Sequence, residues 1–130
     1  MPFQTLKKIT LSLTLIFILL GSVEAQTHRM ATFNIRWDNP NDIGNLWKDR
    51  VPHVIQLIQF HQIGLFGTQE GLTHQVEEMS KGLGYEHLGV GRDDGAKKGE
   101  YTAILFDPDL YQLEDSGTFW LSPTPETPSK

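Results

Sequence analysis

The amino-acid sequence predicts an α/β fold built on a mixed β-sheet. The first observation is the order of the expected elements, which runs strand, helix, strand, helix and then a series of short strands. The second is periodicity, because the helical segments repeat apolar residues at helical spacing, whereas the strands alternate or are continuously apolar. The first half therefore resembles βαβ units with parallel strands, and the second half indicates antiparallel hairpins. No internal repeat or low-complexity segment interrupts this order.

Residues 1–25 have the layout of a secretory signal peptide. Lys7 and Lys8 precede an apolar run over residues 9–20, and Val23-Glu24-Ala25 resembles a cleavage site. The run is short for a membrane span, which needs about 20 residues, although an uncleaved N-terminal anchor is the alternative. We expect residues 26–130 to form the exported domain, secreted or periplasmic, with no stable membrane association after cleavage.

Composition narrows the class of protein. The sequence has no cysteine, which excludes disulfides, thiol nucleophiles and cysteine-type zinc sites, and an exported chain without disulfides is typical of bacteria. Removing Lys7, Lys8 and Glu24 from 11 basic and 16 acidic residues leaves a formal charge of −6. This balance argues against tight non-specific nucleic-acid binding by a basic surface. It suits carboxylates gathered around a divalent cation, or equally a solvated acidic surface.

The first strand and helix are predicted from apolar spacing. Residues 30–37 alternate, with Ala31, Phe33, Ile35 and Trp37 on one face. Residues 48–62 then have a helical stripe, consisting of Val51, Val54, Ile55, Ile58 and Phe60. Pro52 is best tolerated in the first turn, so we expect this helix to begin near Trp47 or Lys48.

The second strand and helix follow directly. Residues 63–70 form a short apolar segment that ends in Gln69 and Glu70, as a buried strand would. Residues 72–83 repeat apolar side chains at helical spacing, and Gly82 and Gly84 end the helix. Further strands are expected over residues 85–90, 100–106, 110–113 and 116–121. Residues 91–99 form a polar loop, 107–109 a turn, and the proline-rich residues 122–130 an extended tail.

Asn34 and Glu70 are the first candidate site residues. Each lies at the end of a predicted strand, and ligands of open α/β sheets gather at the carboxyl ends of strands. A carboxylate after a buried strand is costly unless it is paired, exposed or bound to a cation. Together the two side chains offer an amide and a carboxylate to Mg²⁺ or to a phosphate group. The alternative interpretation is an ordinary polar pair at the edge of the sheet.

A second candidate group surrounds the loop of residues 91–99. Arg92 offers a planar guanidinium for phosphate, and Tyr101 offers a hydroxyl donor. Glu100 is suited to orient a histidine by accepting its ring N–H. A solvated hairpin loop with balanced charges is the alternative. No phosphate-binding glycine-rich loop, serine nucleophile elbow or paired metal-type histidines occur in the sequence.

Five segments together resemble the endonuclease/exonuclease/phosphatase superfamily. They share the order and separation of the family motifs: Ala31-Thr-Phe-Asn34-Ile-Arg36-Trp37, Trp47-x-x-Arg50, Gly67-Thr-Gln-Glu70-Gly71, Gly89-Val-Gly-Arg92-Asp-Asp-Gly95 and Gly99-Glu100-Tyr101-x-Ala103-Ile104. The resemblance spans residues 29–126 and is nearest to the secreted bacterial branch related to the nocturnin-like group. It implies the N-terminal half of a four-layer α/β sandwich of two packed mixed sheets, as in the DNase I-like fold.

The resemblance also implies roles for the candidate residues. Asn34 matches a catalytic asparagine that helps to bind the metal and the scissile phosphate, and Glu70 matches the Mg²⁺-binding glutamate, with Mn²⁺ as the alternative metal. Arg92 matches a position at the substrate phosphate, and Tyr101 matches a neighbouring catalytic position. Glu100 matches a carboxylate that supports a catalytic histidine.

Later family motifs do not occur in this sequence. There is no Asn-Thr-His run, no Gly-Asp-x-Asn run and no adjacent Asp-His pair. We therefore expect a partial domain whose C-terminal half is absent, inactive by itself, from a parent that hydrolyses phosphate esters with Mg²⁺. The expected partner is a phosphate ester, with nucleic acids and nucleotides among the candidates, and no specific protein partner is indicated. The alternative function is a non-catalytic or vestigial module that binds metal or phosphate.

Overall fold

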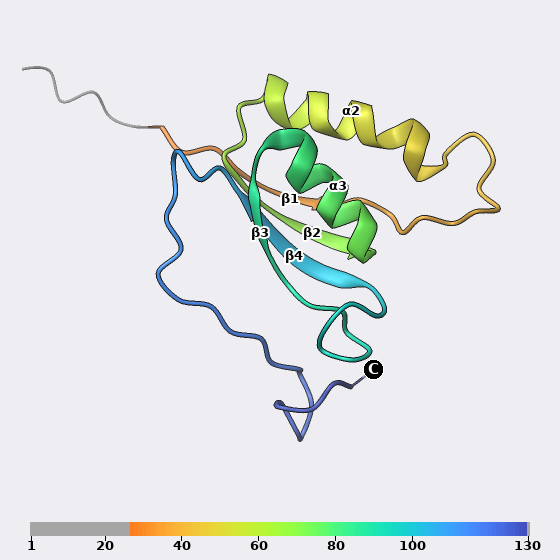
Figure 1. Ribbon diagram of the computed structural model, residues 1–130, viewed down its shortest axis with the longest axis vertical. Helices are drawn as coiled ribbons and strands as arrows, with labels where there is room; N and C mark the ends of the chain where they lie inside the picture. Colours follow the sequence, from red (N-terminus) through yellow and green to blue (C-terminus); the bar gives the residue numbers. More distant parts are fainter. Residues whose placement is uncertain (1–26, 130) are drawn as a thin grey trace, which may run out of the picture.

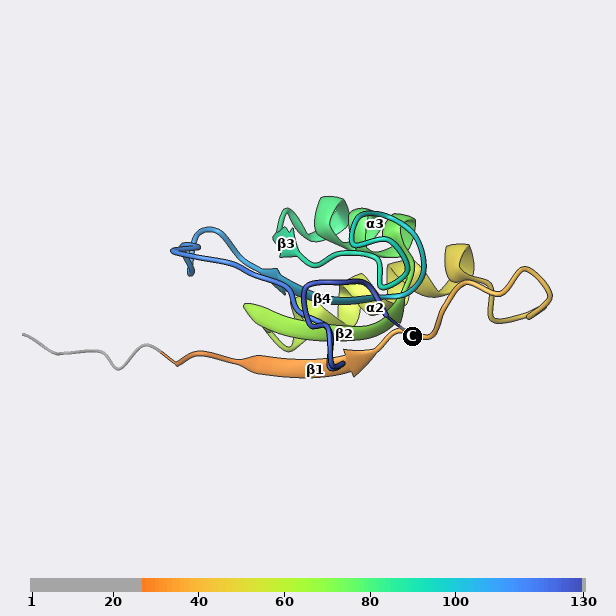
Figure 2. The same ribbon diagram turned by 90° about the horizontal axis from the view of Figure 1, so that it is seen from below.

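The computed structural model describes residues 27–129, in which a four-stranded mixed sheet carries two helices on one face (Figures 1 and 2). The elements in chain order are β1 (Met30–Asn34), α2 (Trp47–Phe60), β2 (Leu65–Gly71), α3 (Thr73–Leu83), β3 (Glu86–Leu88) and β4 (Tyr101–Phe106). The predicted signal peptide lies outside the described residues. Within residues 27–129, no helix has the length and apolar character needed to cross a membrane.

The strands lie in the order β1-β2-β4-β3. β1 and β2 are parallel and are joined through α2, whereas β4 is antiparallel to both β2 and β3. The predicted α/β fold with a mixed sheet is therefore confirmed. Parallel pairing places the carboxyl ends of β1 and β2 at the same edge of the sheet, where Asn34 and Glu70 lie.

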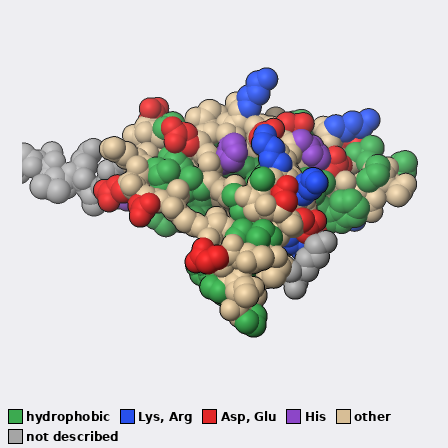
Figure 3. Space-filling model, turned by 60° about the horizontal axis from the view of Figure 1, so that its bottom comes forward, with side chains coloured by type: hydrophobic (Ala, Val, Ile, Leu, Met, Phe, Trp, Pro, Cys, Tyr) green, Lys and Arg blue, Asp and Glu red, His purple; other side chains and the backbone are tan. Residues whose placement is uncertain are grey.

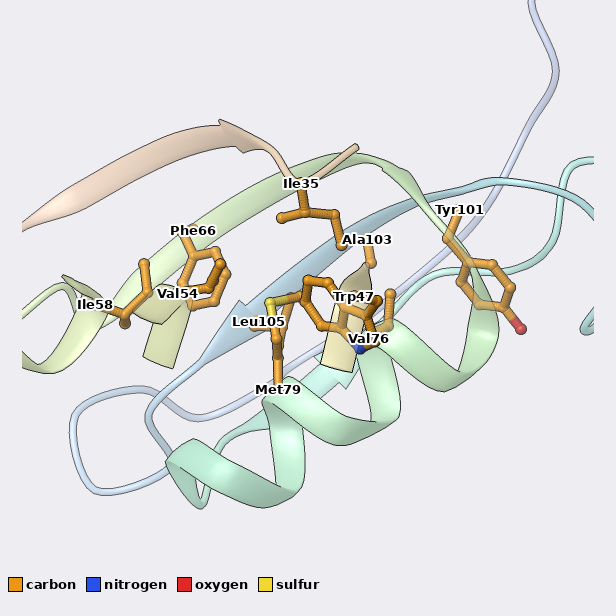
Figure 4. Close-up of a cluster of buried hydrophobic side chains, with 10 residues drawn as sticks. All are labelled: Ile35, Trp47, Val54, Ile58, Phe66, Val76, Met79, Tyr101, Ala103 and Leu105. Carbon is orange, nitrogen blue, oxygen red and sulfur yellow. The ribbon is translucent and has the colours of Figure 1, made fainter. Parts of the chain in front are cut away.

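The hydrophobic core lies between the sheet and its two helices (Figure 4). Trp47 from α2 and Met79 from α3 pack over Phe66 of β2 and Leu105 of β4, and all four side chains are almost inaccessible to solvent. Burial of side chains of this size stabilises the fold by about 1.5–3 kcal/mol each. The core thus fixes both helices, and the loops that precede them, against one face of the sheet.

The first strand is shorter than the sequence predicts. It ends at Asn34, because Arg36 has a φ of 55°, which interrupts the alternation of an extended chain. Ile35 still reaches the core, but Trp37 is 42% exposed instead of sharing the buried face. The turn at Arg36 therefore corrects the predicted end of the strand.

The first helix begins at Trp47, as predicted, but Pro52 is its sixth residue and lies beyond the first turn. Val54 and Ile58 are buried on the predicted stripe, whereas Phe60 is 80% exposed. Two residues along a helix correspond to a rotation of about 200°, so Phe60 points away from the face of Ile58. Phe60 was therefore wrongly assigned to the stripe.

Two of the predicted strands are absent from the described part of the chain. Residues 110–113 form no ladder, because Leu110 and Tyr111 close a turn by donating their N–H groups to the Asp107 carbonyl. Residues 116–121 have no regular secondary structure and pair with no strand in residues 27–129, and a segment without a partner strand is not a β-strand. The strand predicted over residues 85–90 is present but limited to β3.

Candidate metal and phosphate site

Three chain segments bring the candidate residues to one edge of the sheet. Asn34, the last residue of β1, lies opposite Gln69 of β2. Gly71, at the end of β2, lies opposite Tyr101, at the start of β4, and Tyr101 also bridges to Gly91. The amide and carboxylate from the first two strands and the polar loop before β4 therefore meet at this edge, as the sequence predicts.

A β-bulge directs Glu70 within this edge. Thr68 pairs with Ala103 and Gly71 with Tyr101, so β2 has one residue more than β4 over this stretch. Glu70 lies in the bulge with a φ of 62°, a left-handed conformation that costs a non-glycine residue about 1–2 kcal/mol. Bulges of this kind re-aim side chains next to functional sites.

Asn34 holds the Glu70 carboxylate in place. The Asn34 Nδ2 donates to Glu70 Oε1 at 2.8 Å, and the Arg36 backbone N–H donates to Asn34 Oδ1 at 2.8 Å. The second bond fixes the orientation of the amide, because only the oxygen can accept from a backbone N–H. The amide nitrogen of Asn34 consequently faces Glu70, and its oxygen anchors the turn at Arg36.

The donor set at this edge suits Mg²⁺. Glu70 has one hydrogen-bond partner among the described residues, Asn34 on Oε1, which leaves acceptor capacity on the carboxylate. Mg²⁺ commonly takes one or two carboxylates and completes its octahedron with water and substrate oxygens. No group of three or more metal-ligating histidine or carboxylate side chains occurs within residues 27–129. Glu70, whose carboxylate is oriented by the Asn34 amide nitrogen, is therefore the candidate anchor for the cation.

Arg92 and Glu100 form an ion pair beside this edge. Arg92 Nη1 donates to Glu100 Oε2 at 2.8 Å, and their backbones are also hydrogen-bonded. The Arg92 side chain is 52% exposed, so part of its guanidinium faces solvent and is accessible to an anion. Glu100 pairs with Arg92, and no described histidine is bound to it. A guanidinium held by a carboxylate in this way is pre-oriented for phosphate.

Tyr101 faces inward. Its side chain is buried, and its hydroxyl donates to the Ala96 carbonyl at 2.6 Å. This bond ties the loop of residues 91–99 to the start of β4. Gly91 is required at the base of the loop, because a Cβ there would collide with the Lys98 backbone. Tyr101 therefore fixes the loop that carries Arg92, and it would have to release Ala96 in order to donate to a phosphate.

Comparison with known proteins places this geometry in a family. No family model and no curated protein match the chain. Among solved structures, an endonuclease/exonuclease/phosphatase family protein from Bacteroides thetaiotaomicron is 42% identical, with a TM-score of 0.78. The match covers 82% of this chain and 41% of that protein. The chain belongs to the endonuclease/exonuclease/phosphatase family.

Two further structures of the family agree. A mannosyl-6-phosphatase from Bacteroides thetaiotaomicron is 42% identical with a TM-score of 0.77, and a family protein from Bacteroides vulgatus is 44% identical with a TM-score of 0.76. Each match covers 79% of this chain and 40% of the matched protein. The chain thus spans about two fifths of the length of the family structures that it matches.

Charged side chains on the loop of residues 91–99 of this chain have defined partners. Backbone N–H groups of Lys98 and Ala96 donate to the Asp94 carboxylate, which lowers the pKa of Asp94. Lys97 donates a 2.8 Å hydrogen bond to Glu77 of α3, which lowers the pKa of Glu77 and raises that of Lys97. Both side chains are largely exposed, so salt screens this pair and it contributes little to stability. Asp94 therefore does more than the ion pair to shape the loop.

Sequence reasoning assigned no role to two residues that hold the end of β1: Arg50 appeared only within a motif, and Gln75 was not singled out. Arg50 donates to the backbone carbonyls of Ile35, Arg36 and Asn45 and lies over the Trp47 ring. Its position gave a signal, because a cation in the first turn of a helix opposes the helix dipole and indicates a specific partner. Gln75, which is fully buried, binds the same segment. Helical periodicity gave no such signal for Gln75, which falls among apolar positions.

Proposed function

We propose that this chain supplies the metal-holding part of a Mg²⁺-dependent hydrolase of phosphate esters, with Mn²⁺ as the alternative cation. The observation that carries the proposal is the Asn34–Glu70 pair, which lies at the carboxyl ends of two adjacent parallel strands. Glu70 itself and Arg36, which follows Asn34 by two residues, are non-glycine residues with positive φ. Strained backbone persists where the surroundings enforce it, and it concentrates at functional sites.

Each residue has a distinct role in this proposal. Glu70 anchors the cation, and Asn34 orients the carboxylate through its amide. Arg92, held by Glu100, binds a non-bridging oxygen of the substrate phosphate. The bound cation would neutralise charge that develops on the phosphoryl oxygens. Because the sequence has no Asn-Thr-His run, Gly-Asp-x-Asn run or Asp-His pair, these residues alone offer no family-type group to activate water.

The proposed substrate class is supported by the comparisons and by the predicted signal peptide. One structural neighbour is a mannosyl-6-phosphatase, which favours a phosphate monoester on a sugar over a nucleic acid. Figure 3 shows acidic and basic side chains interspersed on one face of the molecule, with no basic stripe for a nucleic-acid backbone. Export, predicted from residues 1–25, suits the scavenging of phosphate esters outside the cytoplasm.

Titration with Mg²⁺, followed by thermal unfolding, tests the metal site. A ligand that binds only the folded state raises the melting temperature as its concentration exceeds Kd. We expect the wild-type chain to be stabilised by Mg²⁺ and by Mn²⁺, and Glu70→Gln to lose this stabilisation. Glu86→Gln is the matched control, because Glu86 is an exposed carboxylate at the opposite end of the sheet. Equal stabilisation of wild type and Glu70→Gln would disprove the proposed site.

Turnover separates the two candidate functions of the chain. With Mg²⁺ and mannose 6-phosphate or bis(p-nitrophenyl) phosphate, we expect the isolated chain to bind metal without measurable hydrolysis. Robust hydrolysis that Glu70→Ala abolishes would show that this chain is catalytic by itself. The chain can also be assayed together with a segment that carries the later family motifs. If it binds metal but hydrolysis is still not detected, the non-catalytic binding module is favoured.

A further inference from the structure

Gln75, in the first turn of α3, is a fully buried polar side chain whose groups are bound to backbone. Its Oε1 accepts the N–H of Leu72 at 3.0 Å and the N–H of Asp38 at 3.0 Å. Its Nε2 donates to the Arg36 carbonyl at 3.0 Å. One amide group therefore joins two segments of backbone that are more than thirty residues apart in the sequence.

The two joined segments are those that carry the candidate metal site. Arg36 follows Asn34 by two residues, and Leu72 follows Glu70 by two residues. Glu70 and Arg36 both have positive φ, and strained conformations of this kind need surrounding contacts to persist. Gln75 provides such contacts on both sides, since it binds the backbone after Asn34 and the backbone after Glu70.

Packing alone does not require glutamine at this position. Leucine would fill a comparable volume next to Val76 and Met79, which are also buried. It would leave the N–H groups of Asp38 and Leu72 without their partner, and a part-buried donor that loses its hydrogen bond destabilises the segment that carries it. The Arg36 carbonyl would keep its hydrogen bond from Arg50 at 3.0 Å. We therefore expect the turn at Arg36 to loosen while α3 stays folded. The amide is therefore suited to setting the position of the turn.

We propose that Gln75 is a positioning residue, which holds the Asn34-bearing end of β1 against the Glu70-bearing bulge of β2. This proposal rests on the proposed function in that it concerns the same site. It predicts that the amide of Gln75 controls metal affinity through the geometry of Asn34, without contacting the metal. It extends the site from the edge of the sheet into the first turn of α3.

The test compares Gln75→Leu with Ser80→Ala in the full chain. Ser80 is the matched control, because its hydroxyl also binds backbone from α3, donating to the Tyr85 carbonyl at 2.6 Å at the opposite end of the helix. Two quantities are measured below the melting temperature of each variant: Kd for Mg²⁺ by calorimetry, and the NMR signals of the Asn34 side-chain amide without metal. We expect Gln75→Leu to weaken Mg²⁺ binding about tenfold and to shift the Asn34 signals, and Ser80→Ala to change neither.

The outcomes distinguish this proposal from the proposed function. If Gln75→Leu lowers the melting temperature as Ser80→Ala does, but leaves Kd and the Asn34 signals unchanged, Gln75 is only structural and the proposal is wrong. If wild type binds no Mg²⁺, the proposed function fails, and the Asn34 signals alone decide whether Gln75 positions Asn34. If Gln75→Leu does not fold, Gln75→Glu decides, because it keeps the two accepted bonds and loses the donor to Arg36.

Discussion

At the level of single residues, the candidate site depends on side chains that hold backbone in unusual conformations. The N–H of Arg36 donates to Asn34, and its carbonyl accepts from Gln75 and Arg50. Glu70 is held by Asn34 and by the bulge in β2. Gln62, the third non-glycine residue with positive φ within residues 27–129, follows the end of α2, where a left-handed residue is common. The strain at Arg36 and Glu70 is therefore specific to the site edge.

The strain at Glu70 predicts an inverted order of stability for two substitutions. Alanine is normally preferred to glycine within a strand by about 0.5–1 kcal/mol. At position 70 we expect Glu70→Gly to be more stable than Glu70→Ala by about 1 kcal/mol, because glycine adopts positive φ without steric cost. Urea denaturation of both variants measures the difference. Thr102→Gly and Thr102→Ala, at an exposed position of β4, are the control pair and should show the normal order. The normal order at position 70 would contradict the strained geometry.

At the level of elements, the loop between β3 and β4 is organised by one carboxylate. Asp94 Oδ1 accepts the N–H groups of Ala96 at 2.8 Å and Lys98 at 2.9 Å. The Tyr101 hydroxyl closes the same loop on the Ala96 carbonyl, and the Trp120 indole donates to the Arg92 carbonyl at 3.2 Å. Arg92 is therefore displayed by a loop that is fixed at several points.

Acid should loosen this loop in a defined range of pH. The pKa of Asp94 is lowered from its ordinary value of 3.8 by the N–H groups of Lys98 and Ala96. A lowered pKa means that the stabilisation is fully present above about pH 4 and is lost as the pH falls through the lower, folded-state pKa. We expect the Ala96 and Lys98 amide NMR signals of wild type to stay constant down to about pH 4 and to shift towards loop-disordered values as the pH falls below 3.8.

Asp94→Asn tests whether ionisation of residue 94 controls the loop, because asparagine carries no charge. The asparagine oxygen can still accept, but it does not ionise, so its loop should be weaker at pH 5 and should change little on acidification. Lys97→Met is a control that removes the exposed ion pair with Glu77 and leaves the bonds of Asp94 intact. If Asp94→Asn shows the same acid transition as wild type, another group controls the loop.

At the level of the whole molecule, the sequence correctly predicted the segments that pair with a neighbouring strand. It wrongly predicted strands in two segments that have no neighbouring strand among the described residues. Alternation and apolar runs identified β1, β2 and β4, because their side chains meet a helical layer. Residues 116–121 have a similar pattern, but no described strand lies beside them. A pattern reports which face of a segment is apolar, and pairing depends on what lies next to it.

The candidate site was likewise predictable from the sequence only in part. The positions of Asn34 and Glu70 at strand ends followed from the sequence, because parallel strands bring their carboxyl ends together. The direction of the Asn34 amide did not follow, since it depends on the bulge at Glu70 and on the turn at Arg36. Gln75 was missed because its role comes from two segments that only the fold brings together. Long-range hydrogen bonds of this kind leave no local pattern.

The open face of the sheet predicts self-association of the isolated chain. Both helices lie on one face (Figure 2). On the other face Ile104 is 45% exposed and borders a hollow of about 540 Å³, which is also lined by Leu88, Val90 and residues 115–118. Leu121 and Phe119 of the C-terminal segment are also exposed. Exposed apolar surface of this kind drives association in water. We expect the purified chain to form oligomers at micromolar concentration, measured by light scattering after size-exclusion chromatography.

Two substitutions identify the face that associates. Ile104→Lys places a charge on the open face, where we expect it to shift the chain towards monomer without lowering the melting temperature by more than a few degrees. Phe60→Lys is the control, because Phe60 is 80% exposed on α2, on the helical side of the sheet, and should leave association unchanged. Association of apolar faces should persist in high salt, whereas association through charges would be screened. A wild-type chain that stays monomeric at every concentration and melts cooperatively would show that the open face is stable in water.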